Sequence, residues 1–191
     1  ISIMSELRTN RIVPRDGLTS GTFNGGGVIQ VKHTAFTGTD DATGAIATAL
    51  TDFESTYNCA ITPKFSTSKI LVEMSMSLSL SVDSNIIMAR LRKKVASGSF
   101  ADVDGALGEA SSNRYRCTAV TVGRSNQYSM FPLHIKYLDS PGTTSALTYS
   151  VSVAHDSGSS RTIYLNRGSN DNDLAYVPRA ISTITLSEIS A

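Results

Sequence analysis

The stretch from Lys69 to Val82, KILVEMSMSLSLSV, decides the fold of this chain. Every second residue in it is apolar, namely Ile70, Val72, Met74, Met76, Leu78, Leu80 and Val82. The residues between them are polar or charged, with Leu71 as the one apolar exception. A period of two matches the alternation of side chains along a β-strand and does not match a helix. The pattern predicts a long strand with one buried face.

Such a strand needs a second layer to cover its apolar face. Burying these side chains contributes roughly 10 to 20 kcal/mol to the stability of the folded state, at about 1.5 to 3 kcal/mol each, before the entropic cost of folding is subtracted. An isolated hairpin offers no layer against which to bury them. The polar opposite face also argues against a strand sandwiched between helices. We therefore expect two packed sheets, as in a sandwich or a barrel.

Similar alternating runs, separated by turn residues, continue along the chain. We expect further strands at residues 28–33, 56–62, 86–95, 115–122, 127–138, 147–155, 161–166 and 181–189. Many short strands with turn-rich joints are typical of a jelly roll or a related Greek-key sandwich. The sequence therefore predicts an all-β, jelly-roll-like β-sandwich.

Two turns also predict which strands pair. Residues 83–85, Asp-Ser-Asn, form a compact turn, so we expect the central strand and residues 86–95 to form a hairpin. Ser-Pro-Gly at residues 140–142 presets a tight turn, so we expect the strands on either side of it to pair.

Other segments carry loop or edge signals. Residues 37–52 and 97–113 are rich in Gly, Ser, Thr, Ala and Asp, and we expect both to be long loops. Phe100, Val103 and Leu107 are the side chains that would pin the second loop. Pro132 lacks a backbone N–H, so it predicts an edge strand or a bulge.

Composition divides the chain into an arm and one domain. We expect an amino-terminal arm with a Gly-rich linker over residues 1–27 and the β-sandwich over residues 28–191. The arm offers Leu7, Ile12 and Val13 as its main apolar points and cannot build a core. We therefore expect these three residues to dock on another chain.

Charge and cysteine content restrict the class of protein. The formal net charge is +1 and the basic residues are scattered, so we expect no nucleic-acid partner. The one basic concentration, which we interpret as a solvated strand edge or end, is Arg90, Arg92, Lys93 and Lys94. No run is long enough to cross a bilayer, and we expect neither membrane insertion nor a secretory leader. Cys59 and Cys117 do not form a disulfide framework, so we expect reduced, buried thiols from a reducing cytoplasm.

The sequence contains no recognisable catalytic constellation. His33, His134 and His155 are isolated from one another, and no zinc-binding or nucleophile-elbow motif occurs. We interpret these histidines as packing or surface groups, and we expect neither an enzyme nor a bound cofactor.

One loop combines acidic and amide side chains, namely Asn170, Asp171, Asn172 and Asp173. Such a loop has the oxygen ligands that Ca²⁺ prefers, and Asp102 with Asp104 is a poorer candidate of the same kind. Neither segment has the complete calcium-loop pattern, and Asp/Asn runs usually build turns. We therefore predict no metal site and treat Asn170 to Asp173 as an exposed contact loop.

The last predicted strand has apolar residues on both faces. Ile184 and Leu186 face one way, while Ile181 and Ile189 face the other. A second covered face suggests either another subunit or a curled sandwich. We therefore expect Ile181 and Ile189 to contribute to an oligomer or virion contact.

A resemblance adds a biological context. It rests on GGGVIQV (25–31), TPKFSTSKILVEMS (62–75), YLDSPGTTSALTYSV (137–151), IYLNRGSNDND (163–173), STITLSEI (182–189) and the arm SELRTNRIVPRDG (5–17). In order and content, these segments resemble the tail-fibre-like virion proteins of tailed bacteriophages, particularly those that infect cyanobacteria and other aquatic bacteria. The resemblance implies a homotrimer of sandwiches like the jelly rolls of tumour necrosis factor or C1q, assembled in the host cytoplasm and anchored to the virion by the arm.

Two functions remain open within that context. The first is a short tail fibre whose loops contact a glycan or protein on the host surface. The second is a head-decoration, cement or fibre-attachment protein that binds other virion proteins, and the absence of a shaft repeat favours this alternative. A depolymerase is disfavoured because no pair of catalytic carboxylates stands out.

Overall fold

The structure, a computed structural model, describes residues 27–45, 50–83, 85–123 and 125–190. The elements, in chain order, are β1 (Val28–Phe36), β2 (Asp40–Ala45), β3 (Thr51–Asp52), β4 (Cys59–Ile61), β5 (Lys69–Leu80), β6 (Ile86–Val95), β7 (Ala101–Asp102), the 3-10 helix η1 (Asp104–Ala106), β8 (Ala119–Val122), β9 (Phe131–Asp139), β10 (Leu147–His155), β11 (Arg161–Leu165) and β12 (Ser182–Ile189). The predicted contact residues of the arm, Leu7, Ile12 and Val13, lie outside the described residues.

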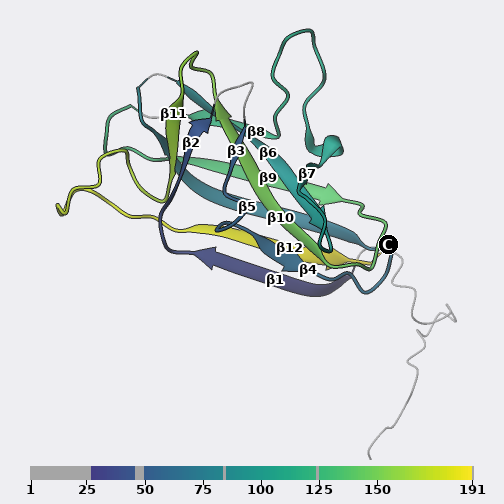
Figure 1. Ribbon diagram of the computed structural model, residues 1–191. Coiled ribbons are helices and arrows are strands. Elements are labelled where there is room, and N and C mark those ends of the chain that lie inside the picture. Colours follow the sequence, from purple (N-terminus) through teal and green to yellow (C-terminus); the bar gives the residue numbers. More distant parts are fainter. Residues whose placement is uncertain (1–26, 46–49, 84, 124, 191) are drawn as a thin grey trace, which may run out of the picture.

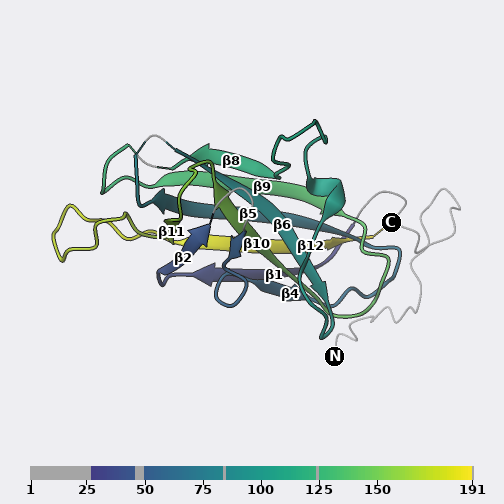
Figure 2. The same ribbon diagram turned by 45° about the horizontal axis from the view of Figure 1, so that its top comes forward.

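The strands form two six-stranded antiparallel sheets that pack face to face (Figure 1, Figure 2). Sheet 1 contains β1, β2, β5, β9, β11 and β12, and sheet 2 contains β3, β4, β6, β7, β8 and β10. Two short strands can occupy one strand position in a sheet, which we call a row. β12 and β11 form such a row, because they follow one another along the same side of β5. In the same way, β1 and β2 follow one another along β12 and β11.

The order of these rows is that of a jelly roll. Sheet 1 reads β1/β2, β12/β11, β5, β9, and sheet 2 reads β3/β4, β10, β6, β8/β7. Successive rows of the chain therefore alternate between the sheets over most of its length, which is the pattern of two interleaved Greek keys. The predicted all-β, jelly-roll-like sandwich is confirmed.

Both predicted strand pairings are wrong. β5 pairs with β9, β11 and β12, whereas β6 lies in the other sheet. Likewise β9 pairs with β5, while β10 pairs with β3, β4 and β6. The turns after β5 and β9 cross from one layer to the other instead of closing a hairpin. A turn sequence specifies a reversal of the chain, but the sheet that the next strand joins is set by long-range packing.

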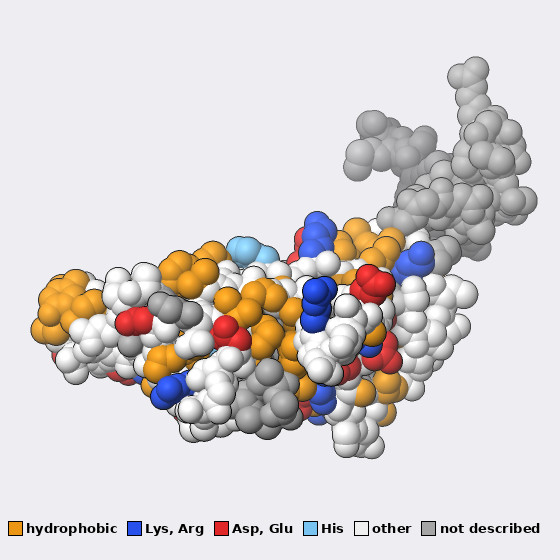
Figure 3. Space-filling view, turned by 90° about the horizontal axis from the view of Figure 1, so that it is seen from above, with side chains coloured by type: hydrophobic (Ala, Val, Ile, Leu, Met, Phe, Trp, Pro, Cys, Tyr) orange, Lys and Arg blue, Asp and Glu red, His pale blue; other side chains and the backbone are white. Residues whose placement is uncertain are grey.

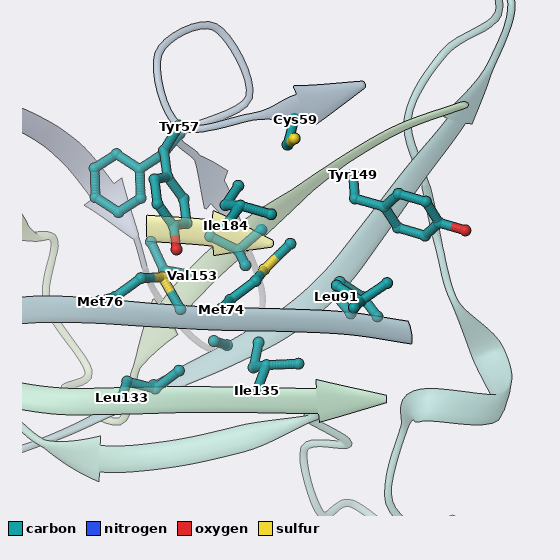
Figure 4. Packing of buried hydrophobic residues seen from close by; sticks show 14 of the residues in the cluster. Tyr57, Cys59, Met74, Met76, Leu91, Leu133, Ile135, Tyr149, Val153 and Ile184 are labelled. Atoms are coloured by element: carbon teal, nitrogen blue, oxygen red, sulfur yellow. The ribbon is translucent and has the colours of Figure 1, made fainter. Parts of the chain in front are cut away.

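The apolar face of β5 is buried against sheet 2, as its alternation predicts. Its inward side chains from Ile70 to Leu80 are all buried. They form one core with Leu91 of β6, Val153 of β10 and Ile184 of β12, and Figure 4 shows side chains of both layers filling the space between them.

The outer face of β5 is less uniformly solvated than alternation suggests. Ser79 is fully buried although it faces away from the core, and its Oγ has no hydrogen-bond partner. Ser75 and Ser77, on the same face, are half-buried. The prediction of a solvent-facing polar row is therefore wrong at Ser79.

Two predicted loops contain regular structure. Residues 37–52 include β2 and β3, and residues 97–113 include β7 and η1. These short edge strands need backbone partners more than apolar side chains, so composition does not reveal them. Val103 is buried and pins the second segment, as expected. Pro132 lies in β9, which pairs only with β5 within the described residues, so its prediction as an edge residue is confirmed.

The edge position predicted for the basic cluster Arg90, Arg92, Lys93 and Lys94 is wrong, because β6 is an inner strand of sheet 2, but Lys93 and Lys94 do lie next to the end of that strand. Arg90 Nη1 lies 2.9 Å from Asp102 Oδ2, and Arg92 Nη1 lies 3.0 Å from Asp102 Oδ1. Lys93 Nζ lies 2.5 Å from Asp139 Oδ2, in the opposite sheet. Arg90, Arg92 and Lys93 are therefore engaged in ion pairs that tie parts of the fold together.

Candidate functional site

A long loop between β11 and β12 projects from one end of the sandwich (yellow, at the left of Figure 1). We call this loop, residues 166–181, together with the neighbouring residues 125–130, the loop tip. In Figure 3, hydrophobic side chains gather at the far left end of the molecule, over the projecting loop. The tip combines an exposed position with apolar and polar side chains, so it is the first candidate contact site.

Asn166 holds the base of the loop tip. It follows β11 with φ +62°, in the left-handed region that Asn tolerates better than most residues. Its buried side-chain amide donates hydrogen bonds to the carbonyl oxygens of Phe36 at 2.8 Å and Gly38 at 2.9 Å. Its Oδ1 accepts a hydrogen bond from Ser182 Oγ at 2.6 Å. Asn166 thus fixes both ends of the loop to the junction of β1 and β2.

The two segments of the loop tip brace each other. The Asn170 backbone N–H donates to the carbonyl oxygen of Gln127 at 2.9 Å. Gly168 packs so closely here that a Cβ would lie 2.7 Å from the same oxygen, so a larger residue would push the segments apart. The loop is therefore held in one geometry before any partner binds.

An aromatic pair also joins the two segments of the loop tip. The rings of Tyr128 and Tyr176 meet edge to face, with 5.4 Å between their centroids. Tyr176 is 62% exposed, and Leu174 beside it is also exposed. Large exposed side chains on a braced loop offer contact area at a small cost in conformational entropy.

The predicted contact residues Asn170, Asp171, Asn172 and Asp173 lie in this loop, and all but the half-buried Asn170 are exposed. Asp171 Oδ1 lies 2.6 Å from Arg179 Nη2, across the loop. Asn170 Oδ1 accepts a hydrogen bond from the Asn172 backbone N–H at 2.9 Å. Asp171 and Asn170 therefore stabilise the loop itself. Within the described ranges, no group of three His, Cys, Asp or Glu side chains could hold a metal ion.

A second surface lies on the outer face of sheet 1. Its apolar side chains, which we call the apolar stripe, are Val28, Val31, Leu71, Leu138 and Ile189. The predicted contact residue Ile189 belongs to the stripe. Ile181 does not, because it precedes β12 and is exposed near the base of the loop tip. The two isoleucines predicted to form one contact thus lie at opposite ends of β12.

Next to the apolar stripe lies an open hollow of about 380 Å³ with a mixed polar and apolar lining. Its floor includes the short side chains of Ser75, Thr183 and Thr185, and the longer Glu73 and Lys136 stand at its side. Lys136 Nζ lies 2.8 Å from Glu73 Oε1. The outer face of sheet 1 therefore has an apolar end and a polar, charge-paired end.

The three histidines remain separate from one another in the structure. His33 and His134 are exposed on sheet 1, and His33 Nδ1 lies 3.0 Å from Thr185 Oγ1. His155 is fully buried. Burial lowers its pKa, against the opposing effect of Asp156, while Arg161 adds to the lowering. This environment favours the neutral ring.

The two cysteines are both free, with Cys59 buried and Cys117 half-buried. Burial raises the pKa of Cys117 in spite of the nearby Arg90, so its thiol stays protonated at neutral pH.

Sequence reasoning missed Tyr128, Leu174 and Tyr176 at the loop tip and most of the apolar stripe. Two signals were present in the sequence. Leu174 and Tyr176 interrupt an otherwise polar loop, and Leu71 is the one apolar residue on the outer face of the central strand. Their partners come from distant segments, so no local pattern joins them.

Comparison with known proteins gives no matching protein-family model and no matching curated protein. No helix within the described residues is long and apolar enough to span a membrane.

Proposed function

We propose that this chain is a structural protein of a phage virion, a short homotrimeric tail fibre. Its arm attaches it to the tail, and its loop tip contacts the host surface. The proposal takes its context from the resemblance of several segments to tail-fibre-like virion proteins. The proposal that one end of the protein attaches and the other end binds the host is argued from the arrangement of the fold.

The observation that supports the proposal is that β1 begins at one end of the sandwich and the loop tip projects from the other. The described chain begins beside the end of β12, where the Ser190 N–H donates to the Gly27 carbonyl oxygen at 3.0 Å and Val28 pairs with Ile189. The loop tip leaves the sheet where Phe36 pairs with Ser182, at the far end of β1. Nine residues of strand separate these points, or about 30 Å. An attachment at one end leaves the other end free to bind.

The chemistry of the loop tip suits a contact surface on a cell. Tyr, Asn, Asp and Ser side chains supply amphipathic rings and adaptable hydrogen bonds, as in other binding loops. The Asp171 carboxylate is paired with Arg179, so the tip is not dominated by one charge. Either a glycan or a protein of the host surface could bind to side chains of these kinds.

A binding assay with the full chain tests the role of the loop tip. Replacing Tyr176 with Ala should weaken binding to host cells by about tenfold or more, since exposed aromatic anchors dominate many interfaces. Phe65 provides a matched control, because it is an equally exposed aromatic side chain near the arm end, where its backbone N–H approaches Glu188. Equal binding by Tyr176→Ala and Phe65→Ala would contradict the assignment of the tip.

The alternative is a head-decoration or cement protein, because this sequence contains no shaft repeat. Electron microscopy of virions labelled on this protein separates the two. Label on the tail supports the fibre, and label on the capsid supports the alternative. Label on neither would end the virion proposal.

A further inference from the structure

The outer face of sheet 1 has an apolar stripe that the sandwich itself does not cover. Val31 pairs with Ser187, Ser187 with Leu71, and Leu71 with Leu138, so these residues form one line across four strands. Val28 and Ile189 pair beside that line. Val28, Val31 and Leu138 are 60%, 54% and 45% exposed. The inward neighbours on the same strands already fill the core, so the stripe is a second apolar surface.

We propose that copies of this chain associate through the outer face of sheet 1, each burying its apolar stripe against a neighbouring copy. A contiguous apolar patch rimmed by polar groups commonly marks a protein interface. The inference deepens the self-association in the proposed function by naming the surface. It stands whether or not the protein is part of a virion.

The charges beside the stripe fit a second copy better than an unrelated charged partner. Glu73 and Lys136 lie next to one another on this face, and the exposed Lys69 pairs with Ile189 of the stripe, so the surface carries charges of both signs. In a closed assembly, each copy can place its lysine near the glutamate of the next copy around the axis, so the surface of one copy complements that of another. A nucleic acid would require a basic surface, and this one has no net charge from the pair.

The hollow adds shape to the same face. Hydroxyl groups of Ser75, Thr183 and Thr185 line its volume of about 380 Å³ together with Glu73 and Lys136. Side chains of a neighbouring copy can enter this space and find hydrogen-bond partners. Interfaces of this kind combine an apolar part with a polar, hydrogen-bonding part.

The start of the arm also points to a second copy. Gly27 is held by Ser190 immediately beside Val28, so the described chain begins at one end of the stripe. In copies joined here, the starts of β1 lie at one end of the assembly. Their loop tips then project from the other end, where several weak contacts can act together.

Substitutions on the full chain test this surface. A carboxylate buried in an apolar contact is unfavourable, so Val31→Asp should raise the dissociation constant of the assembly by about a hundredfold or more. Val120→Asp is the matched control, because Val120 is 52% exposed in a strand of sheet 2. Sedimentation velocity over a range of concentrations measures the mass of each variant, and circular dichroism checks its folding. Leu138→Asp, on another strand of the stripe, gives an independent second test.

The expected result is a multimeric wild type, a multimeric Val120→Asp, and folded monomers for Val31→Asp and Leu138→Asp. A monomeric wild type would overturn the inference, as would a multimer that survives both stripe substitutions. Dissociation of the Val120→Asp control would show that the interface includes sheet 2, and the inference would be wrong. If Val31→Asp instead exposes the arm of a monomer to protease, the occupant is the arm and not a second copy, and the inference is wrong. Virion labelling is a separate measurement, so the two proposals can fail independently.

Discussion

Asn166 sets the geometry of the loop tip. Its side chain satisfies two carbonyl groups at the junction of β1 and β2, and its backbone accepts a hydrogen bond from Ala180 at 3.0 Å. No other residue type combines these hydrogen bonds with ready access to the left-handed region at φ +62°. A single buried amide therefore connects the framework of sheet 1 to the candidate contact site.

Replacing Asn166 with Ala should destabilise the protein by about 2 to 4 kcal/mol, because buried carbonyl groups lose their donors and Ala disfavours this backbone conformation. Asn166→Gly removes the cost of the backbone conformation but does not restore the lost hydrogen bonds. Its free energy of unfolding should therefore lie between those of Asn166→Ala and the wild type. Urea denaturation measures the free energy of unfolding. Asn172→Ala, in the exposed loop, should change it by less than about 0.5 kcal/mol. Similar values for the Asn166 and Asn172 variants would contradict the role given to Asn166.

His155 makes stability depend on pH. Its Nδ1 accepts a hydrogen bond from the Ser157 backbone N–H at 3.1 Å, while its buried Nε2 has no partner. Burial is the main cause of its lowered pKa, so the unfolded chain binds a proton more readily than the folded one. The contribution of neutral His155 to the free energy of unfolding is therefore fully present above its ordinary pKa of 6.5. It is lost as the pH drops from there toward the lower pKa of the folded state.

His155→Leu should flatten this part of the profile. The free energy of unfolding, measured between about pH 7.5 and about pH 5.5, should fall with pH in the wild type and less in the variant. An unchanged slope in His155→Leu would show that another group causes the acid sensitivity.

At the scale of the element, β5 connects the two neighbouring parts of sheet 1. β12 and β11 both lie along one side of it, and β9 lies along the other. Tyr57 supports the gap between β12 and β11, because its hydroxyl donates to the carbonyl oxygens of Thr183 at 2.7 Å and Ser75 at 3.3 Å. The loop tip can leave the sheet at this gap without a loss of core packing.

Substitutions along β5 distinguish alternation from true burial. Alternation alone predicts that Leu78→Asp unfolds the protein and Ser79→Asp is tolerated, but the structure places both residues out of solvent. We therefore expect both changes to cost several kcal/mol, whereas Ser75→Asp should cost less than about 1 kcal/mol. Ser79→Ala should be neutral or stabilising, since it removes a hydroxyl that has no partner. Thermal denaturation measures all four, and a tolerated Ser79→Asp would refute the burial of this position.

At the scale of the whole molecule, the jelly roll acts as a spacer between two ends. One end contains the start of β1, the end of β12 and the apolar stripe, and the other presents the loop tip (Figure 2). The proposed assembly and the proposed contact with the host therefore use different surfaces. A change in one is expected to leave the other intact.

Deletion of residues 1–24 tests this separation. The truncated protein should keep its fold and its self-association, because residues 28–189 supply the strands of both sheets and the core that packs between them. It should no longer attach to virions that lack the full-length protein. Attachment is measured by co-sedimentation with particles, and mass by light scattering. Truncated protein that still decorates particles would show that the arm is not the anchor.

The candidate sites were only partly predictable from the sequence. The loop from Asn170 to Asp173 was identified, because a polar run between strands has no core to join. Tyr128 and Tyr176 lie far apart in the chain, and their contact depends on the brace between Gly168 and Gln127. The apolar stripe likewise needs the pairing of β1, β12, β5 and β9, which no single segment contains.

By itself, the sequence determined that β5 is a strand, which of its faces meets the core, and that the chain builds two layers. A period of two is a local property, and it orients side chains before any partner strand is known. Only the tertiary structure decided that β5 pairs with β9 and not with β6, that Ser79 is buried, and that Val31, Leu71 and Leu138 form one surface. These features depend on contacts between residues far apart in the chain, whose choice follows from the packing of both sheets around a single core.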